Sequence, residues 1–125
     1  MLKMQLKNYK ELIVWQKAYQ LCLEIYKITK KFPKSELFGL SYDLKRTVIS
    51  VPSNIAEGYG RQTTKEYIRF LYISYGSYCE LETKILLTGD LDYISKEEKQ
   101  RLLSLGQEVE RMLKALINSL EKKIT

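Results

Sequence analysis

Histidine is absent from all 125 residues of this chain, so the charged side chains available for chemistry are carboxylates, lysines and arginines. Histidine is the commonest general base and the commonest metal ligand, and its absence removes most hydrolytic and metal-dependent sites. Carboxylates on facing helices can hold two metal ions, but that pattern needs Glu-x-x-His pairs. We therefore expect a protein that is not an enzyme, with no catalytic residues, no metal and no cofactor.

The remaining candidates for chemistry are the carboxylates Asp43, Glu57, Glu80 and Glu82, which we expect near Arg46, Arg61 and Arg69 in the fold. A catalytic site is one interpretation of such a cluster, because carboxylates with shifted pKa values gather at active sites. A structural network of ion pairs and hydrogen bonds is the other interpretation. We predict the structural network, at the corner between the second and third helices, with Asn54, Glu57, Arg61 and Glu80 as its members.

The formal net charge of +6 comes from the first part of the chain. Residues 1–34 contain eight lysines and two glutamates, whereas residues 35–125 contain thirteen basic and thirteen acidic residues. A basic surface attracts nucleic acid or an acidic protein partner, and the alternative is a solvated face that keeps the protein soluble. The candidate phosphate contacts are Lys27, Lys30, Lys31, Lys34, Lys45, Arg46, Arg61, Lys65 and Arg69.

Ten tyrosines suggest a second way to bind nucleic acid, since aromatic rings stack on bases in many single-strand binders. Packing in the protein interior is the competing explanation, because a tyrosine at an apolar helical position turns its ring inward. Such positions are held by Tyr19, Tyr26, Tyr67, Tyr75 and Tyr78. Tyr59 and Tyr72 are then the two rings that we expect to be free to stack.

Composition and termini indicate the compartment. Cys22 and Cys79 lie in apolar helical patterns without a CxxC partner, which favours buried free thiols in a reducing environment. No apolar run approaches the roughly 20 residues that a membrane span needs. The first residues include lysines but no apolar segment or cleavage site of a secretion signal. We expect a cytoplasmic protein.

Apolar residues recur at helical spacing in four segments, which predict helices over about 9–31, 36–58, 64–88 and 96–122 of a single domain, 1–125. Pro33 ends the first helix and Ser35 is the expected cap of the second. Thr63 with Glu66, and Ser95 with Glu98, have the spacing of capping boxes. Short connections make neighbouring helices antiparallel, so the fold expected is an all-α, up-down-up-down four-helix bundle.

The second helix contains a proline. Pro52 lacks an N–H, so the helix must bend or restart there, with Ser53 and Asn54 near the freed backbone groups. Gly58 and Gly60 are expected to end it. In the third helix, Gly76 and Ser77 are small enough for a neighbouring backbone to approach closely.

The first and third helices carry more apolar surface than one bundle needs. The first has two stripes, one of which contains Trp15, Tyr19 and Tyr26, and the other Leu21 and Ile25. A helix with a single buried face carries one stripe, as the fourth helix does. We infer contacts between subunits; the alternative is a first helix that is the most buried member of a monomer.

An ordered series of motifs spanning most of residues 12–93 resembles the 23S rRNA intervening-sequence protein family, also labelled S23 ribosomal protein. The series consists of Trp15-Gln-Lys17-Ala18, Phe32-Pro33, Glu36-Leu-Phe38-Gly39-Leu40, Ser50-Val-Pro52-Ser-Asn54-Ile-Ala-Glu57-Gly58, Arg61, Phe70-Leu71, Gly76-Ser77 and Glu80-Leu-Glu82-Thr83. The resemblance implies a cytosolic bacterial four-helix bundle that forms a homopentameric ring. The sequence is also similar to the accessory variability determinant of diversity-generating retroelements, a basic pentamer that binds nucleic acid and partners a reverse transcriptase.

These observations lead to two hypotheses for function. The first is a non-enzymatic, basic, oligomeric protein that binds the phosphate backbone of RNA or DNA without strong sequence specificity, its modest patch multiplied by ring symmetry. The second is a protein-interaction scaffold for a nucleic-acid enzyme such as a reverse transcriptase, with no direct role on nucleic acid. A third hypothesis, that the protein is an enzyme, is disfavoured because the usual catalytic residues are absent.

Overall fold

The structure of this chain is a computed structural model that describes residues 6–124. The described residues form four α-helices and two short 3-10 helices, with no strand among them, which confirms the predicted all-helical class. The elements in order are η1 (Tyr9–Glu11), α1 (Ile13–Thr29), η2 (Lys34–Glu36), α2 (Leu40–Tyr59), α3 (Thr64–Asp90) and α4 (Lys96–Lys123).

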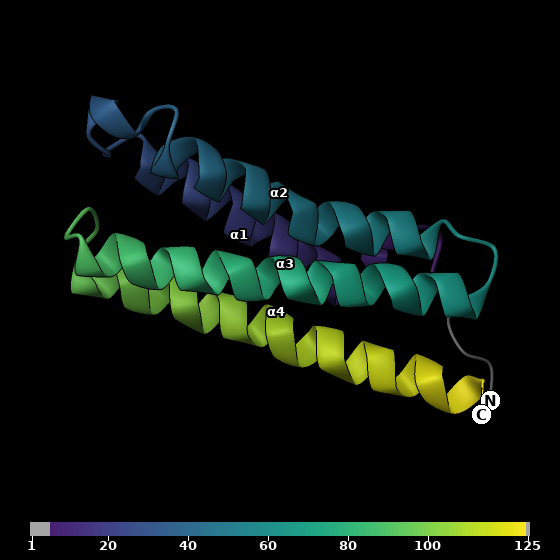
Figure 1. Ribbon diagram of the computed structural model, residues 1–125. Helices are drawn as coiled ribbons and strands as arrows, with labels where there is room; N and C mark the ends of the chain where they lie inside the picture. The colour runs from purple at the N-terminus through teal and green to yellow at the C-terminus, as the bar shows by residue number, and fades with distance from the viewer. Residues whose placement is uncertain (1–5, 125) are drawn as a thin grey trace.

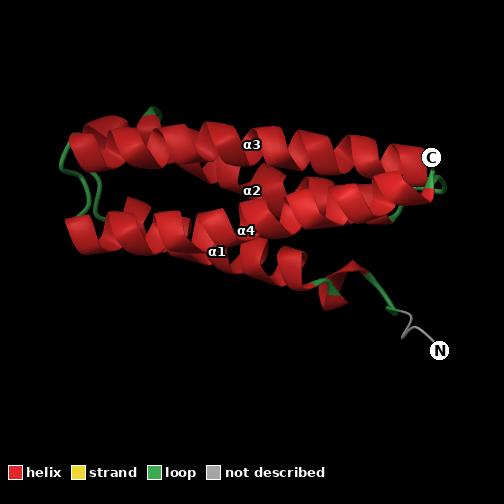
Figure 2. Cartoon of the chain, turned by 90° about the horizontal axis from the view of Figure 1, so that it is seen from below, coloured by secondary structure: helices red, strands yellow, loops and turns green. Residues whose placement is uncertain are grey.

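Each α-helix packs against its neighbours in sequence, and α4 returns to pack against α1, so the four helices surround one core (Figure 1). Consecutive helices run in opposite directions (Figures 1 and 2). The α1–α2 and α3–α4 connections lie at one end of the bundle. The α2–α3 connection, the start of α1 and the end of α4 lie at the other end. Most of the large apolar residues that were predicted to face inward are buried, including Leu21, Leu44, Leu81 and Leu113.

The first two helices begin later than the sequence predicts. In the first segment, the Asn8 side chain accepts a hydrogen bond from the Lys10 N–H and caps η1, and Leu12 is extended, so α1 starts at Ile13 and ends at Thr29. In the second, Ser35 is not the cap. The Glu36 carboxylate instead accepts the Leu40 N–H at 3.0 Å, and α2 begins there.

Of the two predicted capping boxes, the one at Ser95 is confirmed, and the one at Thr63 forms only one of its two hydrogen bonds. Thr63 accepts the Glu66 N–H at 3.1 Å and begins α3. Ser95 and Glu98 form both hydrogen bonds of a capping box and begin α4. At the end of α2, Gly60 is the C-terminal cap in a right-handed conformation, so no left-handed glycine stops this helix.

Pro52 lies inside a continuous α2, where it is buried, so the helix does not restart as the proline suggested. The carbonyl of Val48, four residues earlier, accepts a hydrogen bond of 3.3 Å from the Cys22 thiol of α1. Asn54 donates to the Ser50 carbonyl at 2.7 Å, one turn back along the helix. The carbonyl that the proline leaves open is therefore satisfied by the neighbouring helix.

The close approaches at glycines are not where the sequence placed them. No atom lies within 4 Å of a Cβ added at Gly76, so the prediction of close packing there is wrong within this chain. A Cβ at Gly106 in α4 would lie 2.5 Å from the fully buried Tyr78 ring. A Cβ at Gly58 would lie 2.8 Å from Phe70, which makes this glycine a packing residue between α2 and α3.

Candidate nucleic-acid interface

The nine candidate phosphate contacts fall at two opposite ends of the bundle. One group follows the end of α1 and the start of α2, and the other surrounds the α2–α3 connection (Figure 1). With 20 residues, α2 is about 30 Å long, which keeps the groups apart. The first group contains Lys27, Lys30, Lys31, Lys34, Lys45 and Arg46, and the second contains Arg61, Lys65 and Arg69. One protomer therefore presents two basic regions and not one continuous patch.

Four of the nine cations are engaged with carboxylates. Arg61 lies 2.8 Å from Glu57, and Arg69 lies 3.2 Å from Glu66. Lys31 binds Glu98, and Arg46 lies 4.0 Å from Asp43 and 3.9 Å from Glu80. Within the described residues, the five that form no ion pair are Lys27, Lys30, Lys34, Lys45 and Lys65.

The two arginines at the α2–α3 corner have a further contact. Their guanidinium carbons lie 4.7 Å (Arg61) and 4.6 Å (Arg69) from the centroid of the Phe70 ring. Phe70 is buried, although it lies outside the main core cluster, so the arginines help to cover it. Stacking of guanidinium groups on an aromatic face stabilises such a corner. The sequence pointed to Arg61 as part of this corner but did not indicate Phe70.

The predicted network of Asn54, Glu57, Arg61 and Glu80 is not joined in the structure. Glu57 pairs with Arg61, while the Asn54 side chain bonds to the backbone of its own helix. Glu80 lies 3.0 Å from Lys84, whose ammonium donates to Thr47 of α2 at 2.9 Å. The hydrogen bond from Lys84 lowers the pKa of Glu80, so this carboxylate belongs to a separate α2–α3 contact.

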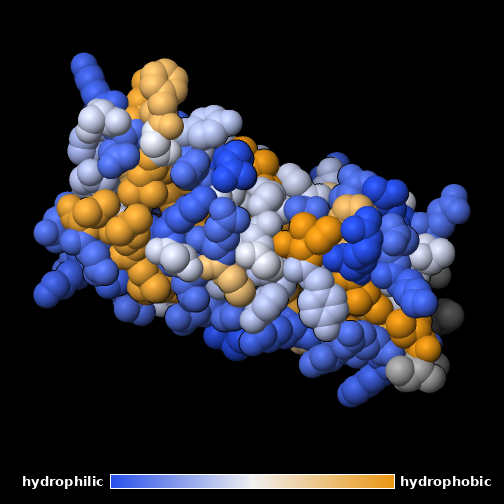
Figure 3. All heavy atoms as spheres, viewed as in Figure 1, coloured by the Kyte–Doolittle hydropathy of each residue, from blue (hydrophilic) through white to orange (hydrophobic). Residues whose placement is uncertain are grey.

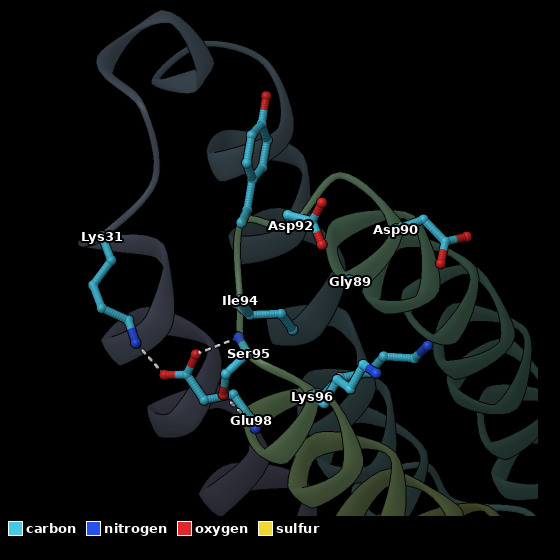
Figure 4. Close-up of a pocket in the computed structure, with 10 residues that line it drawn as sticks. Lys31, Gly89, Asp90, Asp92, Ile94, Ser95, Lys96 and Glu98 are labelled. Carbon is cyan, nitrogen blue, oxygen red and sulfur yellow. Dashed lines mark hydrogen bonds and ion pairs between the residues drawn. The ribbon is translucent and has the colours of Figure 1, made fainter.

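Lys31 connects α1 to the start of α4 (Figure 4). It donates to Glu98, whose other carboxylate oxygen accepts the Ser95 N–H at 2.9 Å. Both hydrogen bonds lower the pKa of Glu98, and the one from Lys31 has the larger effect. The adjoining cavity has a volume of about 570 Å³ and is lined by both acidic and basic residues, Asp90, Asp92, Lys96 and Lys99 among them. A cavity lined by both signs of charge does not favour an anionic ligand.

A second cavity, of about 370 Å³, lies between the end of α1, η2 and the first turns of α2. Three of the unpaired lysines line it, and no carboxylate does. Its complete lining is Thr29, Lys30, Phe32, Pro33, Lys34, Leu37, Ser41 and Lys45. Lys45 also lies over the Tyr26 ring, with its ammonium 5.3 Å from the centroid. The lining of this cavity is therefore basic.

The tyrosines do not divide as predicted. Tyr78 is fully buried, and burial raises the pKa of Tyr67 to about 12. Tyr19 and Tyr26, however, are 49% and 40% exposed, so the prediction that they turn inward is wrong. Trp15 stacks on Tyr19 with ring centroids 5.0 Å apart, beside a groove of about 280 Å³ between α1 and α2.

The two tyrosines that were expected to be free are partly engaged. Tyr59 meets Tyr67 edge to face at 6.0 Å, and its hydroxyl donates to the Leu6 carbonyl at 3.3 Å. Tyr72 is exposed, and its hydroxyl donates to Glu121 at 3.0 Å. The exposed aromatic surface therefore lies on α1 and α2 to a greater extent than the sequence indicated.

Large apolar residues are exposed on several parts of the described surface. On α1 and α2 they include Leu23, which is 58% exposed, with Tyr19, Tyr26, Tyr42 and Ile49. Figure 3 shows a second gathering at the end of the bundle where α2 starts and α3 ends. The exposed residues of those segments are Leu37, Phe38, Leu86, Leu87 and Leu91. The apolar stripe of the first helix that contains Trp15, Tyr19 and Tyr26 is thus only partly covered within one chain.

The two cysteines differ in environment. Cys22 is buried, and burial raises the pKa of its thiol to about 12. Cys79 is exposed, so the prediction that both thiols are buried is wrong for this one. No group of three or more cysteine and carboxylate side chains suited to a metal ion occurs among residues 6–124. In the same range, no helix has the length and apolar character needed to cross a membrane.

Sequence reasoning missed Ser41, which the structure places in the basic cavity. Ser41 and Lys45 are four residues apart at the start of a helix, a spacing that puts both on one face. The signal was hidden because the helix was expected to begin before Gly39. Phe38 lies just before α2 and is 88% exposed.

The fold and the charges define a small helical-bundle protein with basic surface at both ends. Residues 10–115 match the sequence pattern of the 23S rRNA-intervening sequence proteins. The match spans most of the chain, which therefore belongs to this family.

A solved structure supports the same fold. It is the crystal structure of a protein of unknown function from the S23 ribosomal protein family of Bacteroides thetaiotaomicron. The two chains are 22% identical, the match covers 85% of this chain and 96% of that one, and the TM-score is 0.79. At this identity the likeness shows the fold alone. The comparison with curated proteins finds no match.

Proposed function

We propose that this protein is a non-enzymatic, cytoplasmic binding protein for the phosphate backbone of RNA or DNA, without strong sequence specificity. The observation that carries the proposal is the group of unpaired lysines, Lys27, Lys30, Lys34 and Lys45, at the end of α1 and the start of α2. Lysines without carboxylate partners release counterions when they neutralise phosphates. The name of the family, which refers to 23S rRNA, agrees with a nucleic-acid ligand.

The proposal includes assembly into a homo-oligomer, with a ring of five as the arrangement expected from the resemblance. Exposed Leu23, Tyr26 and Ile49 on α1 and α2 are the surface that sister subunits would cover. A ring repeats each basic group around its axis. Several weak contacts to one strand then act together, which raises the overall affinity without new contacts.

A salt titration tests nucleic-acid binding. Fluorescence anisotropy with a single-stranded RNA is measured between about 50 and 200 mM salt, where affinity should fall by about 0.7 logarithmic units per logarithmic unit of salt for each phosphate neutralised. Replacing Lys27, Lys30 and Lys34 together with glutamine should weaken binding and reduce this slope. Replacing Lys96, Arg111 and Lys123 removes the same charge elsewhere and is the control. Absence of binding at low salt, or equal losses in both variants, contradicts the proposal.

The second candidate function is a protein-interaction scaffold for a nucleic-acid enzyme such as a reverse transcriptase. The exposed Phe38, with Leu37 beside it, favours this candidate because apolar residues of this size are costly to leave in water. Co-purification of such an enzyme that survives nuclease treatment and is lost in Phe38→Ser supports it. Loss of the enzyme on nuclease treatment favours the first candidate.

A further inference from the structure

The basic cavity between α1, η2 and α2 contains a hydroxyl without a protein partner. Ser41 is only 4% exposed, and its Oγ makes no hydrogen bond within the described residues. No side-chain nitrogen or oxygen that is wholly shut off from solvent lacks a partner in the same part of the chain. The Ser41 Oγ is therefore open to the cavity that it lines.

The backbone adds positive potential at the same place. Ser41 is the second residue of α2, and the first N–H groups of a helix have no partner within the helix. The Glu36 carboxylate accepts the Leu40 N–H, which leaves the N–H groups of Ser41 and Tyr42 without a protein acceptor in the described chain. Helix starts favour anions, and the Glu36 carboxylate already occupies part of this one. The N–H of Ser41, a residue that lines the cavity, remains for another anion.

Three ammonium groups complete the cavity, those of Lys30, Lys34 and Lys45. Lysines at the end of α1 also interact favourably with the last carbonyls of that helix, and this structural role explains Lys30. Lys45, in the second turn of α2, has a structural contact with the Tyr26 ring. Neither role explains the unpartnered hydroxyl of Ser41. A hydroxyl donor, free N–H groups and ammonium groups without a carboxylate are what a phosphate group requires.

We infer that the cavity lined by Lys30, Lys34, Ser41 and Lys45 binds a phosphate group, either free inorganic phosphate or the terminal phosphate of a nucleic-acid strand. Its volume of about 370 Å³ falls in the range of roughly 300–1,000 Å³ that is usual for small-ligand sites. The inference deepens the proposed function. If the ligand is the terminal phosphate of a strand, the inference rests on the proposed binding of nucleic acid. The cavity supplies a terminal-phosphate contact that differs from sequence-independent contacts along the strand.

The experiment uses the full chain and three probes at constant ionic strength. These are inorganic phosphate, an oligonucleotide with a 5′-phosphate, and the same oligonucleotide with a 5′-hydroxyl. Binding is followed by the NMR shifts of the backbone amides. We expect phosphate to move the amide signals of residues 41 and 42. If the terminal group is the ligand, the phosphorylated strand should bind about tenfold more tightly than its hydroxyl counterpart.

Substitutions make the assignment specific. Ser41→Ala and Lys34→Gln should each lower phosphate affinity about tenfold, since each removes a hydrogen bond to a charged group. Ser53→Ala, at an exposed serine of the same helix, and Lys123→Gln, at the opposite end of the bundle, are the matched controls. Circular dichroism verifies that each variant folds. Equal affinity in Ser41→Ala, Lys34→Gln and the controls overturns the inference.

The probes separate this inference from the proposed function. Strands that bind equally with and without the terminal phosphate, while inorganic phosphate leaves residues 41 and 42 unmoved, overturn the inference and leave backbone binding intact. Inorganic phosphate that binds in the cavity while neither strand binds supports the free-phosphate form and overturns the proposed function.

Discussion

The Cys22 thiol on α1 donates a hydrogen bond of 3.3 Å to the backbone carbonyl of Val48 on α2. In an unbroken helix this carbonyl would accept the N–H of residue 52, but residue 52 is proline and has none. A buried carbonyl without a donor is costly, and the thiol supplies the donor from the adjacent helix. The cysteine and the proline therefore form one structural unit that fixes α1 against α2.

Cys22→Ala should destabilise the protein by about 1–3 kcal/mol, because it leaves the Val48 carbonyl unsatisfied and removes buried volume. Denaturant unfolding followed by circular dichroism measures the change. Cys79→Ala, at the exposed cysteine, is the control and should change stability by less than about 0.5 kcal/mol. Equal effects of the two substitutions would contradict the role assigned to Cys22.

Stability should fall at alkaline pH. Burial raises the pKa of the Cys22 thiol from 9.0 to about 12, so the unfolded chain releases this proton at a lower pH than the folded protein. The stabilising contribution is complete below pH 9 and is lost as the pH rises towards 12. It declines by about 1.4 kcal/mol per pH unit in that window. Unfolding free energies from pH 8 to 10.5 should slope less in Cys22→Ala than in the wild type.

Two glycines on facing helices should respond in opposite ways to alanine. Gly106→Ala places a Cβ 2.5 Å from the ring of Tyr78, which is fully buried and has no room to move, and should cost about 1–3 kcal/mol. Gly76→Ala meets no atom within 4 Å and should stabilise α3 by about 0.5–1 kcal/mol. Thermal unfolding of both variants measures these changes. A loss of stability in Gly76→Ala that depends on protein concentration would place this residue at a contact between subunits.

Acid should weaken the attachment of α4 to α1. The pKa of Glu98 lies below its usual 4.5, first because Lys31 donates to it and then because the Ser95 N–H does. A lowered pKa in the folded state means that this stabilisation is present above pH 4.5 and is lost as the pH falls through the pKa of the folded form. Glu98→Gln should therefore show a smaller loss of stability between pH 5 and 3 than the wild type. Glu97→Gln, at the adjacent exposed residue, should retain the full loss.

The proposed oligomer predicts a specific response to charge on α1. Leu23→Lys, at a side chain that is 58% exposed in one chain, should lower the mass measured by light scattering, because an ammonium group is costly in an apolar interface. Leu86→Lys, at an exposed leucine of α3, is the matched control. A wild-type protein that is a monomer at all concentrations would refute the assembly. Equal masses for wild type and Leu23→Lys would place the interface elsewhere.

The sequence by itself determined the number and order of the α-helices, because helical periodicity and capping residues such as Thr63 and Ser95 are local signals. It also indicated that α1 carries surplus apolar surface, since the stripe that contains Tyr19 and Tyr26 is visible in the spacing alone. The start of α2 also depended on a longer-range contact. Glu36, which starts α2, also accepts the Tyr93 hydroxyl at 2.9 Å, and no local pattern predicts that pairing.

Only the tertiary structure decided which groups meet. It separated Glu80 from Arg61, brought Cys22 to Val48, placed Tyr78 against Gly106 and left Ser41 without a partner in a cavity lined by lysines. Such relationships depend on how one helix is rotated and shifted along its neighbour. A sequence period states which face of a helix is apolar, but the packing of side chains from all four helices sets the rotation and the shift.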